Sequence, residues 1–265
     1  PRALWDLEVQ REQMARLGLD VRVVCPPPFA FRYGQEPPSF HARLNDSLAE
    51  GVASRNGAFI GLASVPLAEP ELAARELERA VSDLGFPGVT IGSLVADFTL
   101  DDPRLEPFWA TAEATRAVIL LHPSEIPGAD RMRSYHLRNL VGNPSGTALA
   151  AAQLIFGGVL DRHPQLKIIL SHGGGALPWI IGRLDHGYAV RPECGGACAR
   201  RPSSYLSSFY FDTIVFSDDV RSRLCEIVGP GRLLYGTDAP FDMSDTAGLA
   251  TADHGTAMSL FKLEG

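Results

Sequence analysis

The sequence predicts an α/β protein of the (β/α)8 barrel class, also called a TIM barrel, and three observations support this prediction. The chain has 265 residues, close to the roughly 250 of a typical barrel, and 45% of them are hydrophobic. Short apolar runs alternate with longer stretches of helical periodicity, as in a parallel sheet covered by helices. The first strand-to-helix turn begins at Cys25-Pro-Pro-Pro and has no dinucleotide-binding glycines, which favours a closed barrel over an open doubly wound sheet.

The apolar runs predict seven strands in one domain that spans residues 1–265. Runs rich in Val, Ile, Leu and Phe are typical of strands buried on both faces. The expected strands are residues 20–25, 59–66, 88–93, 117–122, 166–172, 209–215 and 232–238.

Six helices are expected between these strands. Pro70 can open the second helix, Gly85 follows its end, and Ser217 or Asp218 can cap the last one. The expected helices are residues 42–55, 70–84, 105–115, 147–162, 177–189 and 218–228.

The charge pattern excludes two classes of partner. The formal net charge is −7 and the charges of both signs are mixed along the chain, without the basic run that a nucleic-acid or anionic membrane surface requires. No long uncharged apolar segment and no signal-like start are present, so we expect no membrane span. A small-molecule substrate is therefore expected.

The four cysteines do not form the framework of a disulfide-rich protein, which predicts a cytoplasmic location. Cys25 and Cys225 lie in apolar patterns where a reduced thiol packs well. The pair Cys194 and Cys198 lacks a second pair of zinc ligands nearby and reads as part of a loop. Two long loops, residues 123–144 and 191–207, are candidate lids or partner contacts.

Three expected strands end in His122, His172 and Asp238. Strand C-termini share one rim in a parallel barrel, so these side chains can converge although they are far apart in the sequence. Two imidazoles and a carboxylate suit Zn²⁺, Mn²⁺ or Fe²⁺. A single strand-end histidine is more often a hydrogen-bonded structural residue, but three such groups together favour a metal site. The triple glycine that begins at Gly173 lets backbone approach a ligand closely.

Several stretches, in this order along the chain, resemble the aminocarboxymuconate semialdehyde decarboxylase family of the amidohydrolase superfamily. They span nearly the whole chain and are more specific together than any single motif. They are Ala3-Leu-Trp-Asp6, residues 84–92, Leu121-His122-Pro123, residues 140–148, Ser171-His172 with its glycines, Gly182-Arg183-Leu-Asp185 and Gly236-Thr-Asp238-Ala-Pro-Phe241.

The resemblance implies a site with one divalent metal, zinc in the first place and manganese as the alternative. It implies that His122 and Asp238 are metal ligands and that His172 deprotonates the metal-bound water. Arg183 matches the arginine that binds the substrate carboxylate across the interface of a homodimer. Without the resemblance, Arg183 would read as a surface charge on a helix.

The sequence departs from the family's pattern at three places. The family's first strand carries a His-x-His pair of further metal ligands, and we expect this strand, together with a substrate-binding lysine and arginine, to be missing from the sequence given. The segment after Asp238 is shorter than in the family. Ser124 stands after His122-Pro123 where the namesake enzymes have a tryptophan, so the exact substrate is left open.

The predicted function is metal-dependent, non-oxidative decarboxylation of an aromatic or muconate-semialdehyde-type carboxylic acid. His172 and Asp238 are the expected catalytic residues, Arg183 binds the substrate, and no organic cofactor is needed. The alternative is a metal-dependent hydrolase of a lactone or amide. A metal-free barrel that acts as a binding protein is the third class.

Overall fold

All seven expected strands are present in the computed structural model, which describes residues 2–126, 128–252 and 254–263. They are shorter than the apolar runs, because buried residues such as Val65 and Ile214 continue into loops that pack on the core. The strands are β1 (Arg22–Val24), β2 (Phe59–Gly61), β3 (Gly88–Gly92), β4 (Val118–His122), β5 (Lys167–Leu170), β6 (Phe209–Asp212) and β7 (Leu233–Leu234).

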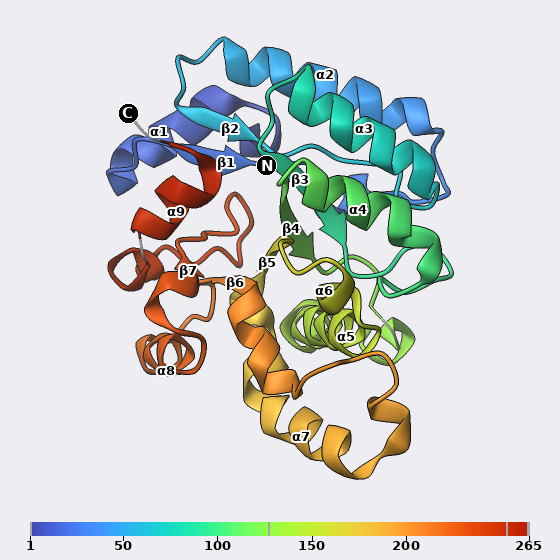
Figure 1. Cartoon of the computed structure of the whole chain (residues 1–265). Coiled ribbons are helices and arrows are strands. Elements are labelled where there is room, and N and C mark those ends of the chain that lie inside the picture. The colour runs from blue at the N-terminus through green and yellow to red at the C-terminus, as the bar shows by residue number, and fades with distance from the viewer. Residues whose placement is uncertain (1, 127, 253, 264–265) are drawn as a thin grey trace.

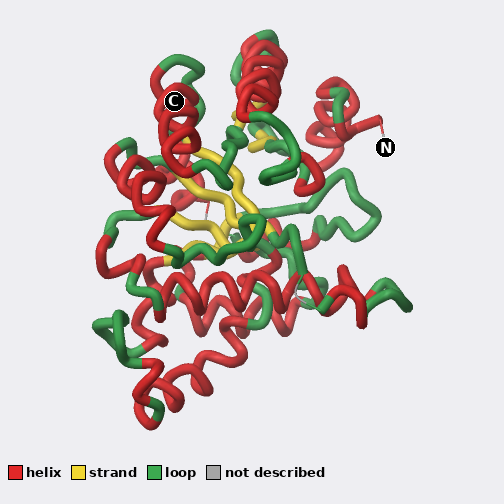
Figure 2. Tube along the Cα trace, turned by 90° about the vertical axis from the view of Figure 1, so that its right-hand side faces the viewer, coloured by secondary structure: helices red, strands yellow, loops and turns green. Residues whose placement is uncertain are grey.

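The strands are parallel and lie in sequence order, as in a barrel. β1 pairs with β2, and β3 to β7 form a five-stranded sheet. A parallel bridge between Ala63 and Val89 joins the two groups. The strands curve as in a barrel (Figure 2). Among the described residues β1 and β7 do not pair, so the barrel is not closed.

The six expected helices are also present, with one break. Residues 147–162 were expected as one helix, but it is interrupted at Gly157 and Gly158, and the backbone φ of Gly158 is +69°. Two further helices, α1 and α9, were not expected. The helices are α1 (Leu7–Leu17), α2 (Pro38–Ala53), α3 (Pro70–Ser82), α4 (Glu106–Ala114), α5 (Asn143–Phe156), α6 (Val159–Arg162), α7 (Leu177–Val190), α8 (Asp218–Val228) and α9 (His254–Phe261).

The expected helix ends are largely confirmed. Pro70 lies in the first turn of α3, and the Ser217 side chain caps α8 by accepting a hydrogen bond from the Val220 N–H at 3.4 Å. The C-cap of α3 is Asp83, and Gly85 follows two residues later with a φ of +69°.

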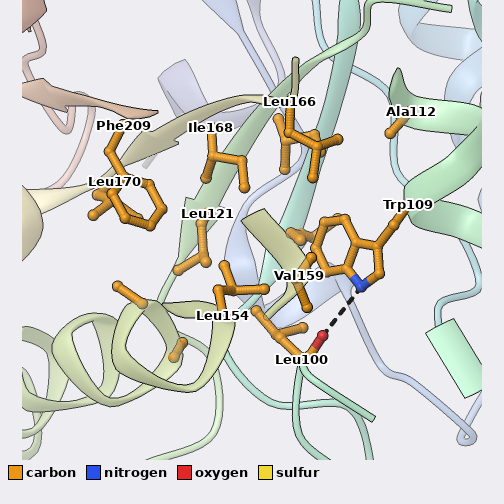
Figure 3. Close-up of a cluster of buried hydrophobic side chains, with 14 of the residues drawn as sticks. Leu100, Trp109, Ala112, Leu121, Leu154, Val159, Leu166, Ile168, Leu170 and Phe209 are labelled. Carbon is orange, nitrogen blue, oxygen red and sulfur yellow. Dashed lines mark hydrogen bonds between the residues drawn. The ribbon is translucent and has the colours of Figure 1, made fainter. Parts of the chain in front are cut away.

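Helices surround the sheet (Figure 1), and the main core is formed by side chains of both. Strand side chains alternate between the two faces of the sheet, and Ile119, Leu121, Ile168 and Leu170 face this core. Figure 3 shows part of it, where the indole N–H of Trp109 donates to the Leu100 carbonyl at 3.1 Å.

The other face of the strands is inside the barrel, and α9 packs against part of it. Leu260 of α9 forms a second apolar cluster with Val118, Ile169 and Leu234. None of the helices within the described residues is long and apolar enough to cross a membrane.

Candidate metal centre and active site

The candidate site lies on the inner face of the barrel, where strand alternation places its residues. On β4, Leu121 faces the core, so Leu120 and His122 face inward. On β5, Leu170 faces the core, so Ile169 and the following Ser171 face inward. On each of these strands, an apolar residue of the inner face is followed two positions later by a polar one. The apolar residues form a wall and the polar residues lie at the rim.

His122, His172 and Asp238 come together as expected. One ligand atom of each lies within 4.8 Å of those of the other two. The two imidazole centroids are 5.0 Å apart, and the rings are inclined at 73°. His172 Nε2 lies 3.7 Å from Asp238 Oδ2, too far for a direct hydrogen bond but close enough for charge attraction.

The surroundings of His122 favour its neutral form, which can bind a metal. Its Nδ1–H donates to the Pro123 carbonyl at 2.8 Å, which leaves the Nε2 lone pair free. Burial, assisted by the positive charge of His172, lowers its pKa to about 4. The ring is therefore uncharged near neutral pH, as a metal ligand must be.

His172 has the opposite tendency. Burial by itself would lower its pKa, but the carboxylates of Asp238 and Asp212 outweigh this effect and raise the pKa above its ordinary value. The Nδ1 atom of His172 is buried and has no hydrogen-bond partner. This imidazole can hold a proton beside an acidic group, as proton transfer requires.

The three groups line a cavity of about 500 Å³. Apolar side chains on or just after the strands, among them Leu62, Leu120 and Ile169, form part of its wall. Ser171 also lines this cavity, and its hydroxyl is buried without a hydrogen-bond partner within the described chain. A cavity of this size that is mainly apolar with a few polar groups fits a small organic molecule.

Two residues of the site were missed in the sequence. Ser171 and Asp212 both line the cavity, and Asp212 ends the apolar run Phe-Tyr-Phe of β6 as His122 ends that of β4. The same signal, a polar residue after an apolar strand, could have identified Asp212. Its carboxylate accepts hydrogen bonds from the N–H groups of His172 and Gly173 at 2.8 and 2.7 Å.

Arg183 lies on α7 and is exposed, and it is not among the residues that line this cavity. Its neighbours one turn earlier, Trp179 and Ile180, are 47% and 36% exposed. The structure therefore does not bring Arg183 to the site of its own chain.

Two other expectations concern the cavity wall. Cys25 was expected to pack in the apolar core, but it lines the cavity, because the residue follows the inward-facing Val23 by two positions. The residue is exposed to solvent, and partial desolvation by the protein around the thiol raises its pKa to about 11. Ser124 packs beside Gly92 and does not line the cavity.

The loops expected to form lids contain short helical turns. Residues 138–142 form a π-helical turn before α5, and Pro127 of the first loop lies outside the described residues. In the second loop, Cys198 is buried and its thiol donates to the Arg200 carbonyl.

The residues present fit a divalent metal. Two imidazoles and a carboxylate converge on one point, and the free lone pair of His122 and the unpaired Nδ1 of His172 are unexplained by protein contacts. Nitrogen and oxygen donors of this kind bind Zn²⁺ and Mn²⁺.

Comparisons with known proteins show the family to which this chain is related. The profile of the amidohydrolase family matches residues 8–256. The 2-amino-3-carboxymuconate-6-semialdehyde decarboxylase of Dictyostelium discoideum is 37% identical over 245 residues, which is 91% of this chain and 68% of that protein. The gamma-resorcylate decarboxylase of Polaromonas sp. is 34% identical over 247 residues, 83% of this chain and 76% of that protein.

A solved structure has the same architecture. The dihydroxybenzoic acid decarboxylase of Polaromonas sp. JS666, with bound manganese and the inhibitor 2-nitroresorcinol, has a TM-score of 0.86 and 29% identity. The match covers 97% of this chain and 86% of that one. These comparisons give no support to the hydrolase alternative.

Proposed function

The chain belongs to the amidohydrolase family, in its branch of metal-dependent decarboxylases, and we propose that it removes CO₂ from a small aromatic or muconate-semialdehyde-type acid at His122, His172 and Asp238. The observation that carries this proposal is the convergence of these three groups on the wall of the cavity. The relatives named above act on acids of this kind.

We assign His122 and Asp238 as metal ligands and His172 as the residue that handles the proton. A divalent metal held there would supply positive charge for the oxygens of a carboxylic acid. Zinc is the metal we expect first, and manganese is supported by the Polaromonas structure, so metal analysis of the purified protein distinguishes the two.

The proton chemistry falls to His172. In a non-oxidative decarboxylation, a proton adds to the carbon that bears the carboxylate, the carbon–carboxylate bond breaks, and its electron pair stays with the substrate as CO₂ leaves. His172 can present a proton at the cavity wall, and the nearby Asp238 carboxylate stabilises the charged imidazole. Leu120 and Ile169 keep this part of the wall apolar, which strengthens the attraction between these charges.

The Ser171 hydroxyl is a further polar group for substrate. Since a buried hydroxyl without a partner costs about 1–3 kcal/mol, we assign it a hydrogen bond to a substrate oxygen. Ser171 lines the cavity and directly precedes His172 in the chain.

We further propose that the protein is a homodimer in which Arg183 of one copy holds a substrate carboxylate of the other. The support is an exposed apolar surface beside Arg183, on elements that pack together at the outside of the barrel. The apolar surface consists of Leu140, Val141, Leu149, Trp179 and Ile180.

Two broader expectations stand as proposals. Residues 1–265 are inferred to form one domain, because the main core draws residues from Phe31 to Leu233 into one cluster. The four cysteines are free thiols, which supports a cytoplasmic location.

The proposal is tested with purified protein and a panel of hydroxybenzoates, muconate-type acids and lactones, with released CO₂ measured after removal and return of Zn²⁺ or Mn²⁺. We expect metal-dependent CO₂ release from at least one acid. Hydrolysis of a lactone without CO₂ release from any acid would contradict it.

A further inference from the structure

Asp212 makes a set of contacts that the proposed chemistry does not use. Its Oδ2 accepts the N–H of His172 at 2.8 Å, and its Oδ1 accepts the N–H groups of Gly173 at 2.7 Å and Ile214 at 3.1 Å. The residue is only 6% exposed. One buried carboxylate therefore ties the end of β6 to the turn that follows β5.

That turn has an unusual backbone. His172 has a φ of +57°, and the three glycines after it have φ values of +59°, +76° and +59°. A residue with a side chain is disfavoured at positive φ by about 1 kcal/mol or more, so surrounding contacts must hold His172 there. The two N–H groups at the start of the turn are those that Asp212 accepts.

Packing on the turn adds to this constraint. A Cβ atom at Gly173 would lie 2.5 Å from Val215 Cγ1, in the segment that follows Asp212. The turn and the end of β6 thus fit closely, and a shift of one moves the other.

The direction of the His172 ring depends on this backbone. The side chain leaves a Cα whose own N–H is fixed by Asp212, and it reaches Asp238 at 3.7 Å and the His122 ring at a centroid distance of 5.0 Å. A change in φ at His172 would swing the imidazole away from both partners.

We propose that Asp212 is a positioning residue, which holds the left-handed turn at His172 and Gly173 so that the imidazole is aimed at the Asp238 side of the cavity. Both of its oxygens are occupied by backbone N–H groups, so it acts through His172. This inference rests on the proposed function only for its effect on turnover.

Asp212→Asn is the main test. An amide keeps one accepting oxygen and replaces the other by an NH₂ group, so at least one of the three N–H groups loses its partner. We expect hydrogen–deuterium exchange of the peptide 171–176 to become faster. We also expect kcat to fall about 10-fold or more, because small misplacements of a reacting group are costly, while KM changes less than about twofold.

Asp161→Asn is the matched control. Asp161 also accepts a backbone N–H, that of Ala199 at 3.0 Å, and the Tyr205 hydroxyl at 2.6 Å, but it does not line the cavity. It should lose stability with kcat unchanged. Thermal unfolding of both variants shows whether they fold.

Three results would overturn the inference: unchanged exchange of 171–176 in Asp212→Asn, faster exchange with unchanged kcat, or an equal loss of kcat in the Asp161→Asn control. If the wild-type protein decarboxylates none of the acids, the proposed function fails by itself. The exchange measurement then still decides whether Asp212 holds the turn.

Discussion

At the scale of single residues, the candidate chemistry is concentrated where strands end and the backbone departs from ordinary geometry. His172 and Asp238 both have positive φ values, +57° and +54°, although neither is glycine. Such conformations persist only where neighbouring contacts enforce them, and they gather at functional sites. The two residues have different proposed roles, which substitution can separate.

Asp238→Ala should lower metal content and activity together, because the lost carboxylate removes both a charge and a coordinating atom. His172→Ala should keep most of the metal and lose about 10² to 10⁴ in turnover, the usual contribution of a positioned acid or base. Metal content and rate are measured on the same samples. A metal-free His172→Ala protein would make His172 a ligand, and a fully active one would remove its proton role.

Ser171→Ala tests the hydroxyl on the cavity wall. We expect KM for the best acid to rise about 3- to 10-fold, the worth of one neutral hydrogen bond, with little loss of folding stability. Ser171→Thr, which retains a hydroxyl, is the matched control and should preserve part of the affinity. Equal KM values for wild type and Ser171→Ala would mean that the hydroxyl does not contact substrate.

At the scale of elements, α7 connects the site to the proposed dimer. Its first turns carry Trp179 and Ile180 on an exposed face, and Arg183 follows one turn later. In Figure 1 this helix lies at the edge of the molecule, away from α1 and α2. Exposed apolar side chains that gather on one face are typical of an interface.

Trp179→Glu should convert the dimer to monomers, because a charge would be buried in the interface. Trp5→Glu is the matched control, since Trp5 is 75% exposed and lies outside the apolar surface. Light scattering after size exclusion measures the mass. Arg183→Ala should keep the dimer and raise KM, and full activity of a dilute wild-type monomer would contradict the cross-subunit role.

At the scale of the whole molecule, we expect stability to depend on pH through His41, a histidine that does not line the cavity. His41 is 1% exposed, its Nδ1 lies 2.8 Å from Ser64 Oγ, and burial lowers its pKa to about 4. A histidine with a lowered pKa favours the folded state above its unfolded pKa of about 6.5. This contribution is lost as the pH falls from about 6.5 to about 4.

His41→Gln should therefore flatten the decline of unfolding free energy between about pH 6.5 and pH 4. A pKa lowered from about 6.5 to about 4 corresponds to a difference on the order of 3 kcal/mol in unfolding free energy. Urea unfolding at several pH values measures it, with the exposed His186 changed to Gln as the control. Parallel pH curves for His41→Gln and wild type would show that His41 does not govern acid stability.

Much of the architecture could be predicted from the sequence, because apolar runs and their spacing report burial directly. All seven strands and six helices were placed by this pattern. α9 was not, since only its packing on Val118, Ile169 and Leu234 explains it. α1 was missed because it is mostly polar, although Asp6 caps it by accepting the Glu8 N–H.

The sequence by itself determined which residue types end the strands, and hence that His122, His172 and Asp238 share one rim. Only the tertiary structure shows which contacts each of them makes there. They include the hydrogen bond that His122 donates to the Pro123 carbonyl and the one that Asp212 accepts from the His172 N–H. Such contacts are made or lost when atoms shift by a few tenths of an ångström, and the spacing of strands along the chain does not encode shifts of this size.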